Sequence, residues 1–190
     1  MVIIRLVQST EMAIVFELWA ECTTDAECNA LMKHFGLFTA TLLTGRPVSF
    51  NVARVDSEGA AMRVSSPDIH EAGLQGVLEC TESGLRLYRH LKNGPPFRYA
   101  RVAWEAGCVP MADLKHWVQD IGSGECRLEV ECVMDQALFT QLGSPKFCYP
   151  FREGYWWTRY QGQAYVPLSS NDQPALKELC LSLFPDYLKY

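Results

Sequence analysis

Basic and aromatic side chains alternate along residues 83–104, a stretch that contains no acidic residue. If this stretch forms a hairpin, Arg86, Tyr88 and His90 share one face of a strand. Arg98 then approaches that face across the following turn. Guanidinium groups bind carboxylates and phosphates, and aromatic rings stack on planar ligands, so the four residues predict a surface for an anion or a nucleotide. The alternative is a solvated sheet face whose arginines pair with carboxylates of the chain.

A second aromatic cluster occupies residues 155–160 and contains the adjacent pair Trp156 and Trp157. On a strand these two side chains point to opposite faces, so one can enter the core while the other covers a helix or stays exposed. Arg159 and Tyr160 follow directly, and arginine and aromatic residues are enriched where proteins bind their partners. The cluster predicts contact with a protein, a sugar or a planar ligand. The alternative is that both tryptophans pack in the core.

One cysteine, Cys108, lies in a glycine-containing loop just before an expected helix. A helix N-terminus lowers the pKa of a thiol and makes it a better nucleophile, and His116 or His90 could act as its base. Nothing in the spacing requires this chemistry, and an inert thiol is the alternative. The P-loop, dinucleotide-binding, HExxH and GxSxG motifs are all missing, so the sequence predicts no cofactor and no defined enzyme class.

Metal binding, secretion and membrane insertion are not expected from the sequence. The chain has eight cysteines and four histidines, but it has no CxxC pair and no histidine at zinc-finger spacing from a cysteine pair, so we expect no metal site. The first residues lack the apolar region and cleavage site of a secretory signal. No apolar run reaches the roughly 18 residues of a membrane span. These features predict a cytoplasmic protein whose cysteines are reduced and structural.

Length and charge narrow the class of protein. The 190 residues are 48% hydrophobic and 21% charged, which predicts a single domain, 1–190, with an ordinary core. The order of the expected elements suggests two similar halves, residues 1–70 and 71–190. The chain has 17 basic and 22 acidic residues and a net charge of -5. Such an acidic protein is a poor binder of nucleic acid and suits a basic partner better.

Patterns in residues 9–105 predict one helix and a series of strands. Thr24 and Glu27 form a capping-box pattern, which predicts a helix over residues 25–35. Residues 9–22 fit both a strand and a helix, with a slight preference for the strand. Turn signals then separate the further strands. These strands cover residues 37–44, 48–56 and 60–65, a hairpin of 76–80 and 85–91, and 97–105.

Patterns in the second half predict three further helices and three strands. Pro110 begins a helix that Gly122 ends, and strict alternation predicts a strand over residues 125–132. The remaining elements are a helix over 136–142, a hairpin of 155–160 and 163–168 about residues 161–162, and a helix over 174–184. The whole pattern predicts an α+β fold in which a mostly antiparallel sheet of meanders and hairpins carries three to four helices on one face.

Three functional hypotheses follow from these features. The leading one is a non-enzymatic binding protein that meets a protein partner through an aromatic-rich sheet face. The second is a binding protein for a small anionic or aromatic ligand, which predicts a concave cavity where an arginine and Trp156 or Trp157 converge. The third is a thiol-dependent enzyme that uses Cys108. A concave cavity favours the second hypothesis, and a flat exposed aromatic patch favours the first.

Overall fold

The core of the fold is an antiparallel sheet of seven strands in the order β4-β5-β1-β6-β7-β9-β8. A computed structural model describes residues 15–57, 59–69, 73–107, 109, 111–123, 131–160, 162 and 173–185. The strands of the main sheet are β1 (Phe16–Cys22), β4 (Asn51–Ser57), β5 (Gly59–Ser65), β6 (Tyr99–Trp104), β7 (Cys132–Asp135), β8 (Tyr149–Arg152) and β9 (Tyr155–Trp157). A separate hairpin pairs β2 (Thr39–Thr41) with β3 (Pro47–Ser49).

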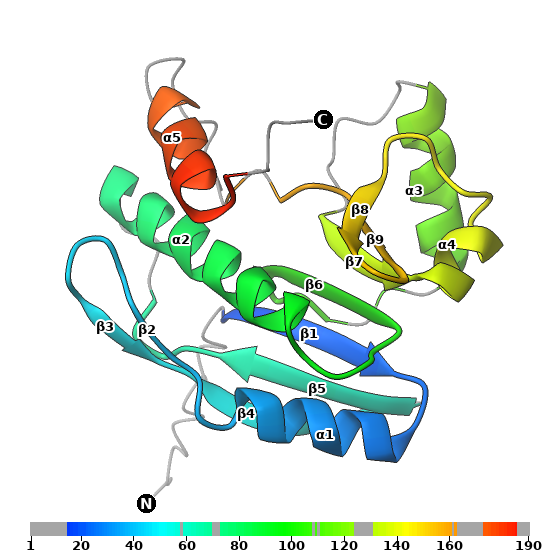
Figure 1. Cartoon of the computed structure of the whole chain (residues 1–190), viewed down its shortest axis with the longest axis horizontal. Coiled ribbons are helices and arrows are strands. Elements are labelled where there is room, and N and C mark those ends of the chain that lie inside the picture. Colours follow the sequence, from blue (N-terminus) through cyan, green and yellow to red (C-terminus); the bar gives the residue numbers. More distant parts are fainter. Residues whose placement is uncertain are drawn as a thin grey trace, which may run out of the picture.

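Five helices in the described residues cover both faces of this sheet (Figure 1). They are α1 (Asp25–Phe35), α2 (Gly73–Lys92), α3 (Met111–Ser123), α4 (Gln136–Gln141) and α5 (Gln173–Leu183). On one face, Leu18 of β1 packs in the same core as side chains of α1, α2 and α5. On the other face, Tyr99 and Met134 pack with Leu114 of α3 and Leu138 of α4. The predicted α+β class is confirmed, but the helices divide between two faces.

The predicted hairpin of residues 76–80 and 85–91 is wrong, because these residues belong to the long helix α2. Cys80, Leu87 and Leu91 recur at spacings of seven and four and are all fully buried, as one face of a helix requires. Residues 81–84, with the sequence Thr-Glu-Ser-Gly, resemble a turn but are buried within the helix. Tertiary contacts described below satisfy the polar side chain of Glu82, so the local turn preference is overridden.

Most other predicted elements are confirmed. The capping box of α1 is present, with Glu27 N–H donating to Thr24 Oγ1 at 3.2 Å. Residues 16–22 form a strand, as do parts of the predicted meander and of residues 97–105, and α3, α4 and α5 lie where helices were predicted. Residues 9–14 lie outside the described part of the chain.

The last predicted hairpin has a different partner. Strand β9 pairs with β8 on one side and β7 on the other, so the described hairpin turns at Glu153–Gly154. Residues 163–168, which were expected to pair with 155–160, lie outside the described residues. So does most of the predicted strand over 125–132, although β7 begins at its last residue, Cys132. Strands from before and after residue 70 join one sheet, because β1 pairs with both β5 and β6.

Candidate functional site

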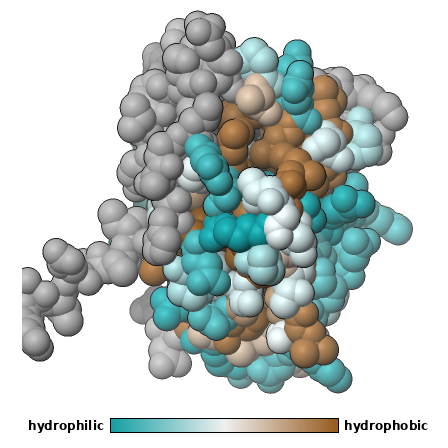
Figure 2. All heavy atoms as spheres, turned by 90° about the vertical axis from the view of Figure 1, so that its left-hand side faces the viewer, coloured by the Kyte–Doolittle hydropathy of each residue, from teal (hydrophilic) through white to brown (hydrophobic). Residues whose placement is uncertain are grey.

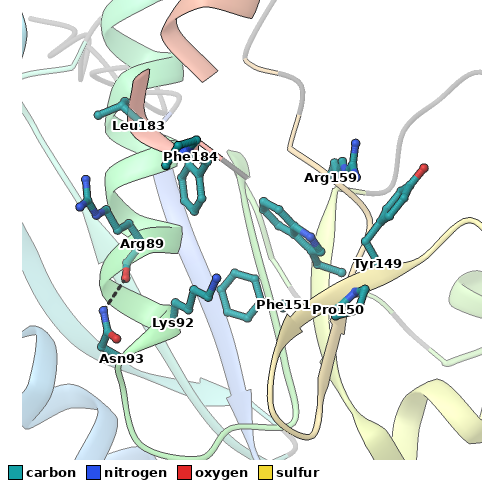
Figure 3. A pocket seen from close by; sticks show the side chains of 11 residues that line it. Arg89, Lys92, Asn93, Tyr149, Pro150, Phe151, Arg159, Leu183 and Phe184 are labelled. Carbon is teal, nitrogen blue, oxygen red and sulfur yellow. Dashed lines mark hydrogen bonds between the residues drawn. The ribbon is translucent and has the colours of Figure 1, made fainter. Parts of the chain in front are cut away.

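A cavity of about 280 Å³ lies between the C-terminal part of α2, the β8–β9 hairpin and the end of α5 (Figure 3). Its residues come from segments far apart in the sequence, so only the folded chain assembles it. They are cationic or aromatic for the most part. The cavity is lined by Arg89, Lys92, Asn93, Tyr149, Pro150, Phe151, Trp157, Arg159, Leu183, Phe184 and Pro185.

Three buried aromatic rings form the apolar part of the lining. The ring centroids of Phe151 and Trp157 are 5.3 Å apart, and those of Trp157 and Phe184 are 5.8 Å apart. Behind them, the fully buried Tyr88 packs against Trp157 with centroids 5.9 Å apart. The rings come from α2, β8, β9 and the end of α5, and they brace one another. A rigid aromatic surface of this kind suits a planar ligand.

Three cations border the aromatic rings. Arg159 lies over the ring of Tyr149, with its guanidinium carbon 3.7 Å from the centroid. Lys92 extends its amine from α2 toward Phe151 (Figure 3). Arg89 points along the outer side of α2, and its carbonyl accepts a hydrogen bond of 3.2 Å from the Asn93 amide. The side chains of Arg89 and Lys92 form no ion pair with any described residue, although both are exposed and charged.

Arg152 holds the β8–β9 wall of the cavity against the end of α2. Its guanidinium donates to the carbonyl of Pro95 at 3.0 Å and stacks over Tyr155, with its carbon 4.2 Å from the ring centroid. Tyr155 in turn donates its hydroxyl to the carbonyl of Phe97 at 2.9 Å. These contacts satisfy backbone groups that follow the helix and fix the hairpin. Arg152 was not among the predicted site residues, because nothing in its local sequence indicates that its side chain reaches residues 94–95.

A glycine in the middle of α2, Gly84, allows the chain that follows β9 to pack closely on this helix. Tyr160 is fully buried and packs so closely on α2 that a Cβ added to Gly84 would lie 2.5 Å from its hydroxyl oxygen and 2.6 Å from Cζ. Only glycine permits this approach. Tyr160, one of the predicted binding residues, is buried against α2 and holds the chain that carries Arg159 and Trp157.

The two tryptophans point to opposite faces of the sheet, as the sequence predicted. Trp157 lines the cavity, whereas Trp156 stacks on Phe139 of α4 with ring centroids 4.3 Å apart. The indole N–H of Trp156 donates to Gln136 at 2.8 Å. Trp157 and Arg159 are therefore the two predicted binding residues that the cavity brings together. Trp156 belongs to the packing of α4.

The predicted strand face of Arg86, Tyr88, His90 and Arg98 does not exist, because the first three residues lie on α2. Tyr88 points into the core, where its hydroxyl accepts the N–H of Val102 at 2.9 Å. Arg98 precedes β6 and forms an ion pair of 3.9 Å with Glu21 of β1, so it does not join the three residues of α2. The expectation failed because a helix places alternate residues about 200° apart rather than on one side.

Arg86 and His90 share a helix face, but each has a structural partner. The guanidinium of Arg86 donates to the buried carboxylate of Glu82 at 2.6 Å and 2.8 Å. His90 stacks on His34 with centroids 3.9 Å apart. The ring Nε2 of each of these histidines lies 3.0–3.1 Å from the backbone carbonyl of the other. Burial, the largest cause, lowers the pKa of His90.

Cysteine chemistry finds no support within the described residues. Cys108 lies outside them, and its predicted base His116 is exposed on α3. The six described cysteines are buried, and burial raises the pKa of Cys22, Cys132 and Cys148 to about 12. No group of three or more possible metal ligands occurs in the described part of the chain. None of its helices is both long and apolar enough to cross a membrane.

An open apolar groove of about 760 Å³ lies at the other end of the α2–α5 pair, beside the tip of the β2–β3 hairpin. Figure 2 looks onto this side of the molecule and shows hydrophobic residues gathered in its upper part. Glu79 and Glu82 lie at the groove, where Arg46 pairs with the first and Arg86 with the second. Both oxygens of Glu82 also accept the N–H of Leu43 at 2.9 Å. These carboxylates therefore have ion-pair partners, whereas Arg89 and Lys92 of the cavity form no ion pair with a described residue.

Comparisons with models of protein families, with curated protein sequences and with solved structures gave no match to this chain. The function is therefore argued from the cavity itself. Its described lining combines three cations with flat aromatic rings and contains no carboxylate, imidazole or thiol. Those are the groups that most often transfer protons or form covalent intermediates. The lining is suited to holding an anion.

Proposed function

We propose that this protein binds a small planar aromatic anion in the cavity between α2, α5 and the β8–β9 hairpin. The observation that carries the proposal is that Arg89, Lys92 and Arg159 line the same cavity as buried aromatic rings. The whole chain has a net charge of -5, so three cations and no carboxylate at one cavity are not a consequence of composition.

The size of the cavity supports a small ligand. Its volume of about 280 Å³ is near the lower limit of the range of roughly 300–1,000 Å³ for small-molecule sites. Within this lining an aromatic ring can stack against Trp157 and Phe184, while a carboxylate or phosphate binds Lys92 or Arg159. Benzoates, indole carboxylates and aryl phosphates all have this combination of one ring and one acidic group.

The same geometry weighs against a contact through the aromatic cluster. That hypothesis predicts a flat exposed patch, but Trp157 is only 6% exposed at the cavity and Trp156 stacks on Phe139. A protein partner remains a prediction, as does a thiol enzyme that uses Cys108. The concave site with a converging arginine and tryptophan is the feature that distinguishes the ligand hypothesis.

Calorimetry with matched aromatic probes tests the proposal. We expect benzoate, indole-3-acetate or phenyl phosphate to bind, and the neutral analogue benzamide to bind at least about tenfold more weakly than benzoate. Arg159→Gln and Lys92→Gln each remove one cation and should weaken anion binding about tenfold. Lys177→Gln is the matched control, because Lys177 is an exposed lysine of α5 that does not line the cavity.

The outcome distinguishes binding at the cavity from nonspecific electrostatic attraction of anions to surface cations. Equal binding of benzoate and benzamide, or equal weakening by Lys177→Gln, contradicts the proposal. Failure of all the aromatic anions to bind contradicts it as well. Far-ultraviolet circular dichroism of each variant shows whether the fold is intact, so that a loss of binding is not a loss of folding.

A further inference from the structure

A second hollow adjoins the cavity on the other side of Arg89. It has a volume of about 290 Å³ and lies between β2 and the C-terminal part of α2. Its lining includes Phe38, Thr39, Arg86, Arg89, His90 and Asn93. Arg89 and Asn93 line both hollows. These two side chains therefore form a ridge with a ligand-sized space on each side.

Helix geometry explains this arrangement. Positions 86, 89, 90 and 93 are separated by three, four and seven residues, so they lie on one face of α2. Lys92 lies about 60° to one side of Arg89, toward the first cavity, and Arg86 lies about 60° to the other side. The Asn93 amide donates to the Arg89 carbonyl and ties the ridge to the end of the helix.

The second hollow repeats the chemistry of the first. Its wall is aromatic, because Phe38 stacks on His90 with ring centroids 4.3 Å apart, and His90 stacks on His34. Its cations are Arg86, which already pairs with Glu82, and Arg89, whose guanidinium forms no ion pair with a described residue. None of the described residues that line this hollow is acidic. The Arg89 guanidinium has several N–H donors and can serve an acidic group on each side of the ridge.

We propose that the ligand carries two acidic groups and crosses the Arg89–Asn93 ridge, with its aromatic ring in the first cavity and its second acidic group in the hollow beside Thr39. This inference rests on the proposed function and extends it from a monoanion to an extended aromatic dianion. A helix with its side chains is about 10–12 Å wide, so a linker of a few bonds is sufficient to cross part of its surface.

Two probes with one aromatic group distinguish a single site from an extended one. Benzoyl-glycine has one carboxylate, and benzoyl-glutamate adds a second on a short linker. We expect the wild-type protein to bind benzoyl-glutamate about tenfold more tightly, because the added carboxylate gains a charge-assisted hydrogen bond. Thr39→Glu places a competing carboxylate at the hollow and should remove this difference. Because Arg89 also lines the first cavity, the affinity for benzoyl-glycine should fall too, but by less than the affinity for benzoyl-glutamate.

The matched control is Thr41→Glu. Thr41 is exposed on the same strand and the same side of β2, but it does not line the hollow, so the difference between the two probes should remain. If the wild type binds the two probes with equal affinity and Lys92→Gln weakens the binding of both, the proposal of an extended dianion is wrong. The proposed function then still holds. If neither probe binds, both proposals fail.

Discussion

The charged side chains at the two ends of the α2–α5 pair differ in whether they form ion pairs. In the groove beside the β2–β3 hairpin, Glu79 and Glu82 are buried and each is held by an arginine. In the cavity at the other end, Arg89 and Lys92 are exposed and no described carboxylate pairs with them. The carboxylates of the groove thus stabilise the fold through ion pairs, whereas Arg89 and Lys92 of the cavity form no ion pair within the described part of the chain.

Part of this contrast is expected of any helix, because the helix dipole favours basic residues such as Arg89 and Lys92 in the last turn. The helix dipole does not explain the pairing, however. A buried carboxylate without a partner is costly, so Glu82 needs Arg86 and the Leu43 N–H for the chain to fold. An exposed lysine needs no partner for folding. Charge alone is therefore a poor sign of function, and the informative feature is whether the fold already satisfies it.

The largest expected effect comes from Gly84, which lies on α2 between the groove and the cavity. In Gly84→Ala the new Cβ meets the buried ring of Tyr160 at 2.5–2.8 Å, which outweighs the gain in helix propensity of about 1 kcal/mol. Overpacking of this kind costs typically about 1–3 kcal/mol, and we expect the upper end because Tyr160 has no free space. Urea unfolding measures the loss. If the alanine variant is as stable as the wild type, the close packing that sets the cavity wall is not present.

The failure at α2 shows what a sequence can and cannot predict here. Short turns and amphipathic helices follow from local residues, and so α1, α3, α4, α5 and the β4–β5 hairpin were predicted near their actual positions. Gly84 was predicted to lie in a turn, as part of residues 81–84. In the structure a glycine is required there because Tyr160, which is distant in sequence, packs against it. Distant partners of this kind are absent from any local pattern.

The candidate site divides in the same manner. Trp157 and Arg159 were predicted, because they lie two residues apart in one aromatic segment of the sequence. Lys92 and Phe184 were not, because they join these residues only through the packing of α2 and α5 on the sheet. Arg86 and His90 were predicted to bind through a strand face, and the second hollow brings them together on a helix instead.

A smaller effect is expected for the buried carboxylate of the groove. Glu82→Gln removes the charge that Arg86 binds and weakens the acceptor of the Leu43 N–H, so the free energy of unfolding should fall by about 1–3 kcal/mol. Glu178→Gln is the matched control, because Glu178 is an exposed residue of the same groove with no ion pair to a described residue. It should change stability by less than about 0.5 kcal/mol. Equal losses of unfolding free energy in the two variants contradict the view that the ion pair of Glu82 stabilises the fold.

A modest dependence on pH is expected from His90, beside the ridge. Burial lowers the pKa of His90 from its usual value of 6.5, so the folded state favours the neutral ring. Its contribution to stability is complete above that value and is lost as the pH falls through the lower pKa of the folded protein. Unfolding in urea from about pH 7.5 down to about pH 5.5 should show this loss. His90→Gln should flatten the plot of unfolding free energy against pH, whereas His116→Gln on the exposed face of α3 should not. If the wild type and His90→Gln give the same plot, His90 is not the group responsible for the loss.

The smallest effect on stability is expected at Lys92, and it tests the comparison most directly. Lys92→Gln removes an attraction to the end of α2, but it also removes repulsion from Arg89 and Arg159 at the same cavity, so the two changes oppose each other. We expect the free energy of unfolding to change by less than about 0.5 kcal/mol, although anion binding weakens about tenfold. Glu82→Gln should show the reverse, a clear loss of stability with little change in anion binding, because its groove is at the other end of the helix pair. If Lys92→Gln costs as much stability as Glu82→Gln, the cation is part of the fold, and its exposure without a partner no longer indicates a ligand.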